Sequence, residues 1–163
     1  MEFDENKDEE TEDKYTEDEY VDIYSKGAIL GFSAFFGVIF GGVLLMLNLR
    51  AAGFKRAAWQ VLIFSIFYHI LSGIIISSTG MKINVAAIKA GANGAQLSPE
   101  QVQSVVALYA LTLVVNIAGG LVLTRYFFKK YFPDNDYFPK PIWTPLLVAI
   151  LIAIAASYIV RIG

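Results

Sequence analysis

Four long segments of this chain contain no Asp, Glu, Lys or Arg: residues 27–49, 57–81, 102–124 and 142–160. Each has 19 to 25 residues, and a helix needs roughly 20 apolar residues to cross a hydrocarbon core of about 30 Å. All 28 charged side chains, 13 basic and 15 acidic, lie outside these segments. A soluble protein would place charges along the water-facing sides of its helices. The pattern therefore predicts an all-α membrane protein with four transmembrane helices in a compact bundle.

The first 22 residues differ sharply in composition from the rest. They hold twelve of the fifteen acidic residues and only two basic ones, Lys7 and Lys14, which leaves eleven basic and three acidic residues for the remaining 141. A stretch so charged and so poor in apolar residues cannot bury enough surface to offset the entropy of ordering. We expect residues 1–22 to be a disordered acidic tail and residues 23–163 to form the transmembrane domain. A secretory signal begins with positive charge instead, so the first span should be retained.

Basic residues near the span ends predict an orientation, because Lys and Arg are enriched in cytoplasmic loops. Seven belong to the connections at 50–56 and 125–141, against four on the opposite side. The seven are Arg50, Lys55, Arg56, Arg125, Lys129, Lys130 and Lys140, and the four are Lys26, Lys82, Lys89 and Arg161. This count places the two basic connections in the cytoplasm and both termini outside it.

Small residues recur at a four-residue spacing in every apolar segment. Lipid supplies no hydrophobic drive for helix association, so small residues and interhelical hydrogen bonds must hold the helices together. Positions four apart lie on one helix face. This favours a bundle with small-residue faces turned inward, or alternatively a homo-oligomer joined through Gly37 and Gly41. The predicted packing residues are Ser33, Gly37, Gly41, Gly73, Gly120 and Ala153.

His69 is the only histidine of the chain and lies within the second apolar segment. An ionisable residue inside a membrane span is a functional candidate by default. The sequence indicates a candidate polar intramembrane site made of Ser65, His69, Ser77, Thr112 and Asn116. The simpler interpretation is a neutral imidazole that forms a hydrogen bond across helices, to Asn116 or to a serine.

Sequence motifs of catalysis are missing. The chain has no G-x-S-x-G, no H-E-x-x-H and no phosphate-binding glycine loop. It has no cysteine, and the apolar segments offer no carboxylate to join His69 in a metal site. We therefore expect a non-enzymatic protein without catalytic residues, metal or cofactor.

A helix start precedes the third apolar segment. Ser98 suits the N-cap, Pro99 the first helical position and Gln101 a capping box. The helix is predicted to run from Pro99 to about Tyr131, roughly 48 Å at 1.5 Å per residue. The aromatic residues beyond it alternate with basic ones, which is typical of a membrane interface rather than of nucleic-acid binding. Lys129 and Lys130 are predicted to bind lipid headgroups.

The stretch from Tyr24 to Arg50 begins Tyr-Ser-Lys-Gly-Ala-Ile-Leu-Gly-Phe and ends Leu-Asn-Leu-Arg. It resembles the start of small multi-spanning bacterial membrane proteins, in which a glycine-rich first span ends in Asn followed by basic residues. The resemblance covers the first two apolar segments, and the long acidic tail departs from it. It implies a bacterial inner membrane and carries no activity and no site residues.

Two functions fit these observations. The first is a structural or accessory subunit that packs with other membrane proteins or with itself in the lipid bilayer. The second is a small oligomeric channel or transporter with a polar path near His69 and Asn116. Transporters usually show internal repeats or helices broken at mid-membrane, and the sequence gives no convincing sign of either. The accessory role is therefore the preferred prediction.

Overall fold

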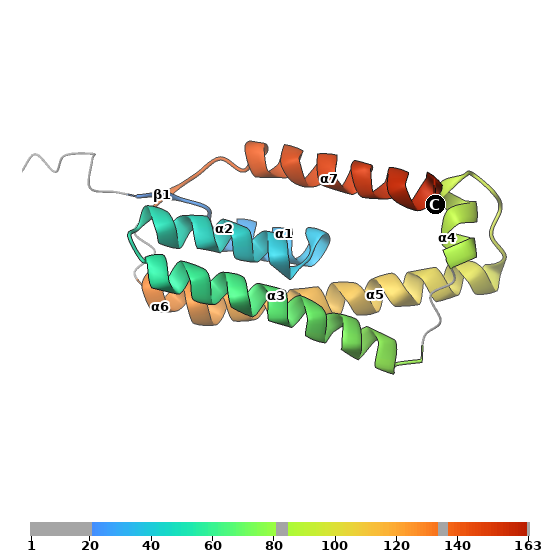
Figure 1. The fold of residues 1–163 in the computed structure, drawn as a ribbon, viewed down its shortest axis with the longest axis horizontal. Helices are drawn as coiled ribbons and strands as arrows, with labels where there is room; N and C mark the ends of the chain where they lie inside the picture. Colours follow the sequence, from blue (N-terminus) through green and yellow to red (C-terminus); the bar gives the residue numbers. More distant parts are fainter. Residues whose placement is uncertain (1–20, 81–84, 134–136, 163) are drawn as a thin grey trace, which may run out of the picture.

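The computed structural model describes residues 21–80, 85–133 and 137–162 and is mostly helical (Figure 1). The helices are α1 (Lys26–Phe36), α2 (Val38–Ala51), α3 (Lys55–Ser78), α4 (Val85–Ala92), α5 (Pro99–Val122), the π-helix η2 (Leu123–Phe128), α6 (Lys129–Tyr131) and α7 (Trp143–Ile162). Two short strands, β1 (Asp22–Ile23) and β2 (Phe138–Pro139), pair in parallel. Of the predicted acidic tail, residues 1–20 lie outside the described residues, and Asp22 is part of β1.

The first apolar segment is not one continuous helix. α1 ends at Phe36 and α2 begins at Val38, and Gly37 between them has a φ of +95°. Only glycine adopts such a value without steric cost. The two helices then fold back against each other as a hairpin (Figure 1). The predicted single helix over residues 27–49 is therefore not formed, and the two helices of 11 and 14 residues reach only about 17 and 21 Å.

The hairpin returns the chain to the end at which it started. The Asn48 side chain, near the end of α2, accepts a hydrogen bond from the Tyr24 N–H through Oδ1 and donates one to the Tyr24 carbonyl through Nδ2, both at 2.8 Å. The start of the described chain therefore lies at the same end of the molecule as the 50–56 connection. Residue 22 lies beside β2, in the connection between α6 and α7.

One end of the molecule thus gathers the start of the described chain and both basic connections (Figure 1). We call it the basic end. Its cationic residues are Lys26, Arg50, Lys55, Arg56, Arg125, Lys129, Lys130 and Lys140. α3 runs away from this end and α5 runs back toward it, whereas α4 and the end of α7 lie at the opposite end (Figure 1).

Among the described residues, two helices are long and apolar enough to cross a membrane: Lys55–Ser78, and the continuous helix Pro99–Tyr131 formed by α5, η2 and α6. The second matches the predicted range, and the Ser98–Gln101 capping box is present. Only 17% of the most apolar window of each helix is buried, whereas a core helix of a soluble protein is mostly buried. The predicted fourth span, 142–160, falls in α7, whose described apolar part is the shorter Trp143–Tyr158.

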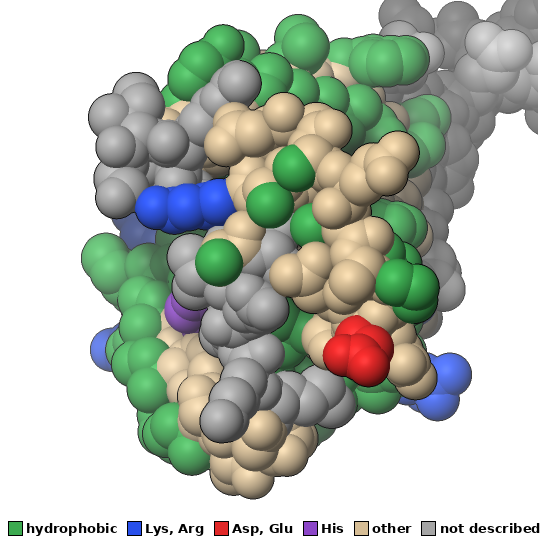
Figure 2. Space-filling model, turned by 90° about the vertical axis from the view of Figure 1, so that its right-hand side faces the viewer, with side chains coloured by type: hydrophobic (Ala, Val, Ile, Leu, Met, Phe, Trp, Pro, Cys, Tyr) green, Lys and Arg blue, Asp and Glu red, His purple; other side chains and the backbone are tan. Residues whose placement is uncertain are grey.

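The buried core surrounds the hairpin and the basic end rather than the axis of a four-helix bundle. Ile29, Leu45, Val61, Leu123 and Phe128 are completely buried. Gly119 and Gly120 are the buried residues of α5, so only its last part contacts the core. The far portions of α3 and α5 expose apolar side chains, and hydrophobic side chains border the face seen from the α4 end (Figure 2).

Candidate functional site

Three of the predicted packing residues meet at one point. Ser33 on α1 is completely buried, and its hydroxyl donates to the Ile29 carbonyl at 2.7 Å. A Cβ atom on Gly41 would lie 2.7 Å from that carbonyl oxygen and would overlap the Ser33 hydroxyl. A Cβ atom on Gly120 would lie 2.7 Å from the Ser33 Cβ. The two glycines therefore allow α2 and α5 to approach α1 closely.

The other three predicted packing residues lie elsewhere. Gly37 forms the turn of the hairpin, and no atom lies within 4 Å of a Cβ built on it. Gly73 is exposed on α3 and likewise has nothing within 4 Å, and Ala153 is exposed on α7. Four-residue spacing alone did not distinguish these positions from those that pack.

Two further glycines were missed by the sequence argument. A Cβ on Gly42 would lie 2.7 Å from the Ser65 Cβ, and a Cβ on Gly119 would lie 2.6 Å from the Tyr68 ring. Each is the neighbour of a glycine that was predicted. Adjacent glycines place small residues on two faces of a helix. The pairs Gly41–Gly42 and Gly119–Gly120 could therefore have indicated that α2 and α5 each pack against more than one helix.

The predicted polar residues do not gather into one site. The Ser65 and Thr112 hydroxyls both donate at 2.8 Å to carbonyls of their own helices, those of Val61 and Leu108. Such bonds are the usual arrangement for Ser and Thr inside helices. The Asn116 amide donates to the Ala34 carbonyl near the tip of the hairpin, at a long 3.4 Å.

His69 is exposed on α3, and so is Ser77. The apolar side chains of Ile66, Phe67 and Ile70 beside His69 are also exposed. Within the described residues the structure records no hydrogen bond from the imidazole. The predicted bond between His69 and Asn116 is therefore not formed, because His69 faces outward from the helix pair.

Replacing His69 by Leu should change the free energy of unfolding by less than about 0.5 kcal/mol, as expected for a surface position. Tyr68→Phe is the matched comparison, since its hydroxyl donates to the Val115 carbonyl at 2.8 Å and links α3 to α5. Losing that bond should cost roughly 0.5–1.5 kcal/mol. Thermal unfolding in detergent measures both, and an equal loss for the two variants would contradict the outward placement of His69.

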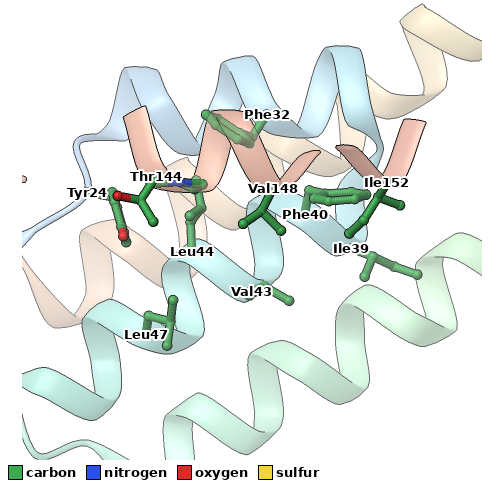
Figure 3. A pocket seen from close by; sticks show the side chains of 11 residues that line it. Tyr24, Phe32, Ile39, Phe40, Val43, Leu44, Leu47, Thr144, Val148 and Ile152 are labelled. Carbon is green, nitrogen blue, oxygen red and sulfur yellow. The ribbon is translucent and has the colours of Figure 1, made fainter. Parts of the chain in front are cut away.

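α2 and α7 face each other across an apolar cavity of about 450 Å³ (Figure 3). Side chains of α2 such as Phe40, Val43 and Leu44 form one wall, and Val148 and Ile152 of α7 form the other. Among the described residues that line it, the Tyr24 phenol is the one ionisable group, so the cavity suits a hydrocarbon chain or an apolar side chain.

A second cavity, of about 280 Å³, lies at the basic end between α1 and the helix of η2 and α6. Lys26, Arg125 and Lys129 contribute its cationic groups. The two lysines predicted to bind headgroups have different surroundings. Lys129 lines the cavity, whereas the Lys130 ammonium lies over the Tyr131 ring, 5.5 Å from its centroid.

Within the part of the chain that the structure describes, no group of three or more His, Cys, Asp or Glu residues could hold a metal ion. No protein-family model, curated protein or solved structure matches this chain. A proposal of function therefore rests on the residues and their geometry.

Proposed function

We propose that this chain is a non-enzymatic, multi-pass protein of the bacterial inner membrane that acts as an accessory subunit, packing with other membrane proteins or with itself. The observation that carries the proposal is the exposure of α7. Every residue from 150 to 158 is exposed, including Leu151, Ile152 and Ile154. A helix that is apolar all round belongs in a membrane or inside a larger assembly, and an apolar surface of this extent is not stable in water.

We infer three crossings and one re-entrant hairpin instead of four crossings. α3, the continuous helix from α5 to α6, and α7 cross the bilayer, while α1 and α2 enter from the basic end and return to it. Backbone at membrane depth must be hydrogen-bonded internally. Three groups at the hairpin tip meet this demand: the Gly37 N–H donates to the Ser33 carbonyl and the Phe40 N–H to the Gly37 carbonyl, both at 3.0 Å, and the Ala34 carbonyl accepts from the Asn116 amide at 3.4 Å.

The distribution of Lys and Arg between the two ends predicts which end faces the cytoplasm. The basic end carries eight cationic residues, Lys26 now among them, whereas the described part of the opposite end has Lys89 and Arg161. Because Lys and Arg concentrate in cytoplasmic loops, the basic end faces the cytoplasm. The C-terminus then lies outside, as the sequence suggested, but the N-terminal segment lies in the cytoplasm.

Single cysteines in this cysteine-free chain test the topology. Asp22→Cys and Ala51→Cys, both at the basic end, should react with an impermeant thiol reagent only after the cells are permeabilised. Ala95→Cys, after α4, should react in intact cells. These exposed positions avoid Gly53 and Gly94, whose positive φ disfavours a side chain. Labelling of Asp22→Cys together with Ala95→Cys would restore a full crossing at residues 27–49.

The geometry favours an accessory role over a channel. The hydroxyls of Ser65 and Thr112 are bonded to their own helices, and His69 faces outward. A polar path would need such groups to face one another. α7, in contrast, contributes Ala149 to the core, places Leu146 against it and contacts α4, but residues 150–158 stay exposed and leave much of its surface for lipid and for a neighbouring helix.

Purification in mild detergent followed by mass measurement tests the association. We expect an oligomer or a stoichiometric partner rather than a lone monomer. Ala153→Leu adds bulk on the small-residue face of α7 and should weaken the association, whereas Ile154→Leu, a volume-conserving change beside it, should not. A monomer without a partner, in nanodiscs as well as in detergent, would contradict the accessory role.

A further inference from the structure

The cavity at the basic end collects positive charge from segments far apart in the chain. Lys26 comes from the first turn of α1, Arg125 from η2 and Lys129 from α6. The acidic residues of the described chain are Asp22 and Glu100, and neither lines the cavity. Three cations around one cavity without a carboxylate repel one another, and a bound anion would relieve that repulsion.

We propose that this cavity binds the phosphate group of an anionic membrane lipid. At about 280 Å³, and with roughly 30 Å³ for each water of the liquid, it has room for a phosphate group with part of its hydration. The first turn of α1, Lys26 and Gly27, lines the cavity and adds the partial positive charge of a helix N-terminus. The proposal rests on the membrane placement proposed above.

One of the three cationic residues, Lys26, is half-buried and positioned by a contact with the core, whereas Arg125 and Lys129 are exposed beside it. The Lys26 ammonium lies 5.4 Å from the centroid of the Phe128 ring, and that ring is completely buried. Arg125 and Lys129 lie four residues apart on the continuous helix that carries Phe128. A cation placed over a buried ring keeps its position without losing its charge. The Lys26 ammonium is therefore in place before a ligand arrives, and the exposed Arg125 and Lys129 side chains are free to close on a bound anion.

The apolar part of the cavity favours a lipid over a free phosphate ion. Leu30 of α1 and Leu121 of α5 line the same cavity as the cations. On α5, Leu121 is next to the apolar residues that lead away from the basic end. A lipid whose phosphate is bound by the three cations would place its glycerol and acyl chains beside these leucines. A free phosphate ion would make no apolar contact with them. Basic cavities between helices at the cytoplasmic face bind lipid headgroups in this way.

Native mass spectrometry of the delipidated full-length protein in neutral detergent tests the site, with dioleoyl phosphatidylglycerol, dioleoyl phosphatidylcholine and inorganic phosphate as probes. We expect one phosphatidylglycerol molecule to bind more tightly than any further one and more tightly than phosphatidylcholine. Lys129→Gln should weaken that first binding roughly fivefold, and joint replacement of the three cations by Gln roughly a hundredfold. Lys130→Gln, the matched control outside the cavity, should change it less than about twofold because its charge is screened.

Equal losses for Lys129→Gln and Lys130→Gln would overturn the proposal and indicate diffuse attraction to the basic end. Displacement of phosphatidylglycerol by millimolar inorganic phosphate, or equal binding of phosphatidylglycerol and phosphatidylcholine, would also overturn it. Lys129 is exposed and lies outside the core, so its variant keeps the fold even if the triple variant does not. Cysteine labelling of the Lys129→Gln protein separates a failed site from a failed topology, because only the second changes the labelling pattern.

Discussion

Replacing Asn48 by Leu should lower the free energy of unfolding by roughly 2–6 kcal/mol, because two buried backbone groups lose their partners and each costs about 1–3 kcal/mol. Asn48 is only 2% exposed and bonds both the N–H and the carbonyl of Tyr24. Leu has a similar size but neither donor nor acceptor. Chemical or thermal unfolding in detergent, followed by circular dichroism, measures the loss.

Asn116→Leu is the matched control for this variant. Asn116 is half-buried and makes one long bond of 3.4 Å, so its loss should cost at most about 1 kcal/mol. Asn48→Asp adds a chemical test. It retains an acceptor for the Tyr24 N–H but turns a second oxygen toward the Tyr24 carbonyl, so it should not recover the stability lost in Asn48→Leu. Similar losses at Asn48 and Asn116 would show that the contact between Tyr24 and Asn48 does not hold the hairpin closed.

Gly41→Ala should destabilise the protein by roughly 1–3 kcal/mol, the usual cost of overpacking. A Cβ there would lie 2.7 Å from the Ile29 carbonyl oxygen. Since that oxygen belongs to the backbone, no rotamer change removes the clash, and α1 and α2 must separate. The melting temperature in detergent should fall accordingly.

Gly31→Ala, on the same hairpin, should have the opposite effect on the stability of the protein. Gly31 lies inside α1, and a Cβ on it would have no neighbour within 4 Å. Alanine there should be neutral or should stabilise α1 by up to about 1 kcal/mol, because glycine weakens a helix interior. If Gly41→Ala raised the melting temperature as Gly31→Ala does, the close approach of α1 and α2 at Ser33 would be refuted.

Local signals in the sequence predicted local structure well. The Ser98–Gln101 capping box and the helix from Pro99 to Tyr131 are present as predicted, since both depend on neighbouring residues. The fold-back at Gly37 was missed because hydropathy does not register a turn. The Gly37 and Phe40 N–H groups at the tip are bonded to nearby backbone carbonyls, so these two groups need no polar side chain that would mark the turn in the sequence. The bond of Asn48 to a residue 24 positions earlier likewise leaves no local pattern.

For the candidate sites too, properties visible at single residues were predicted, whereas properties set by the three-dimensional fold were not. Ser33, Gly41 and Gly120 were predicted as packing residues because small size is visible in the sequence. The outward face of His69 was not predictable, because a helix with apolar residues on all sides does not reveal which side meets lipid. Lys26 was placed opposite Lys129 because residues 27–49 were read as a crossing. The hairpin in the structure brings the two lysines to the same cavity.

The hairpin also constrains the order in which this protein can be made. Synthesis proceeds from the N-terminus, so α1 and α2 leave the ribosome long before the residues that complete their surroundings. Ser33 packs against Gly120, the Phe128 ring lies beneath Lys26, and β1 needs β2 at residues 138–139. The hairpin therefore completes its packing only after residues 120, 128 and 138–139 have been synthesised, so a segment translated early is among the last to reach its final surroundings.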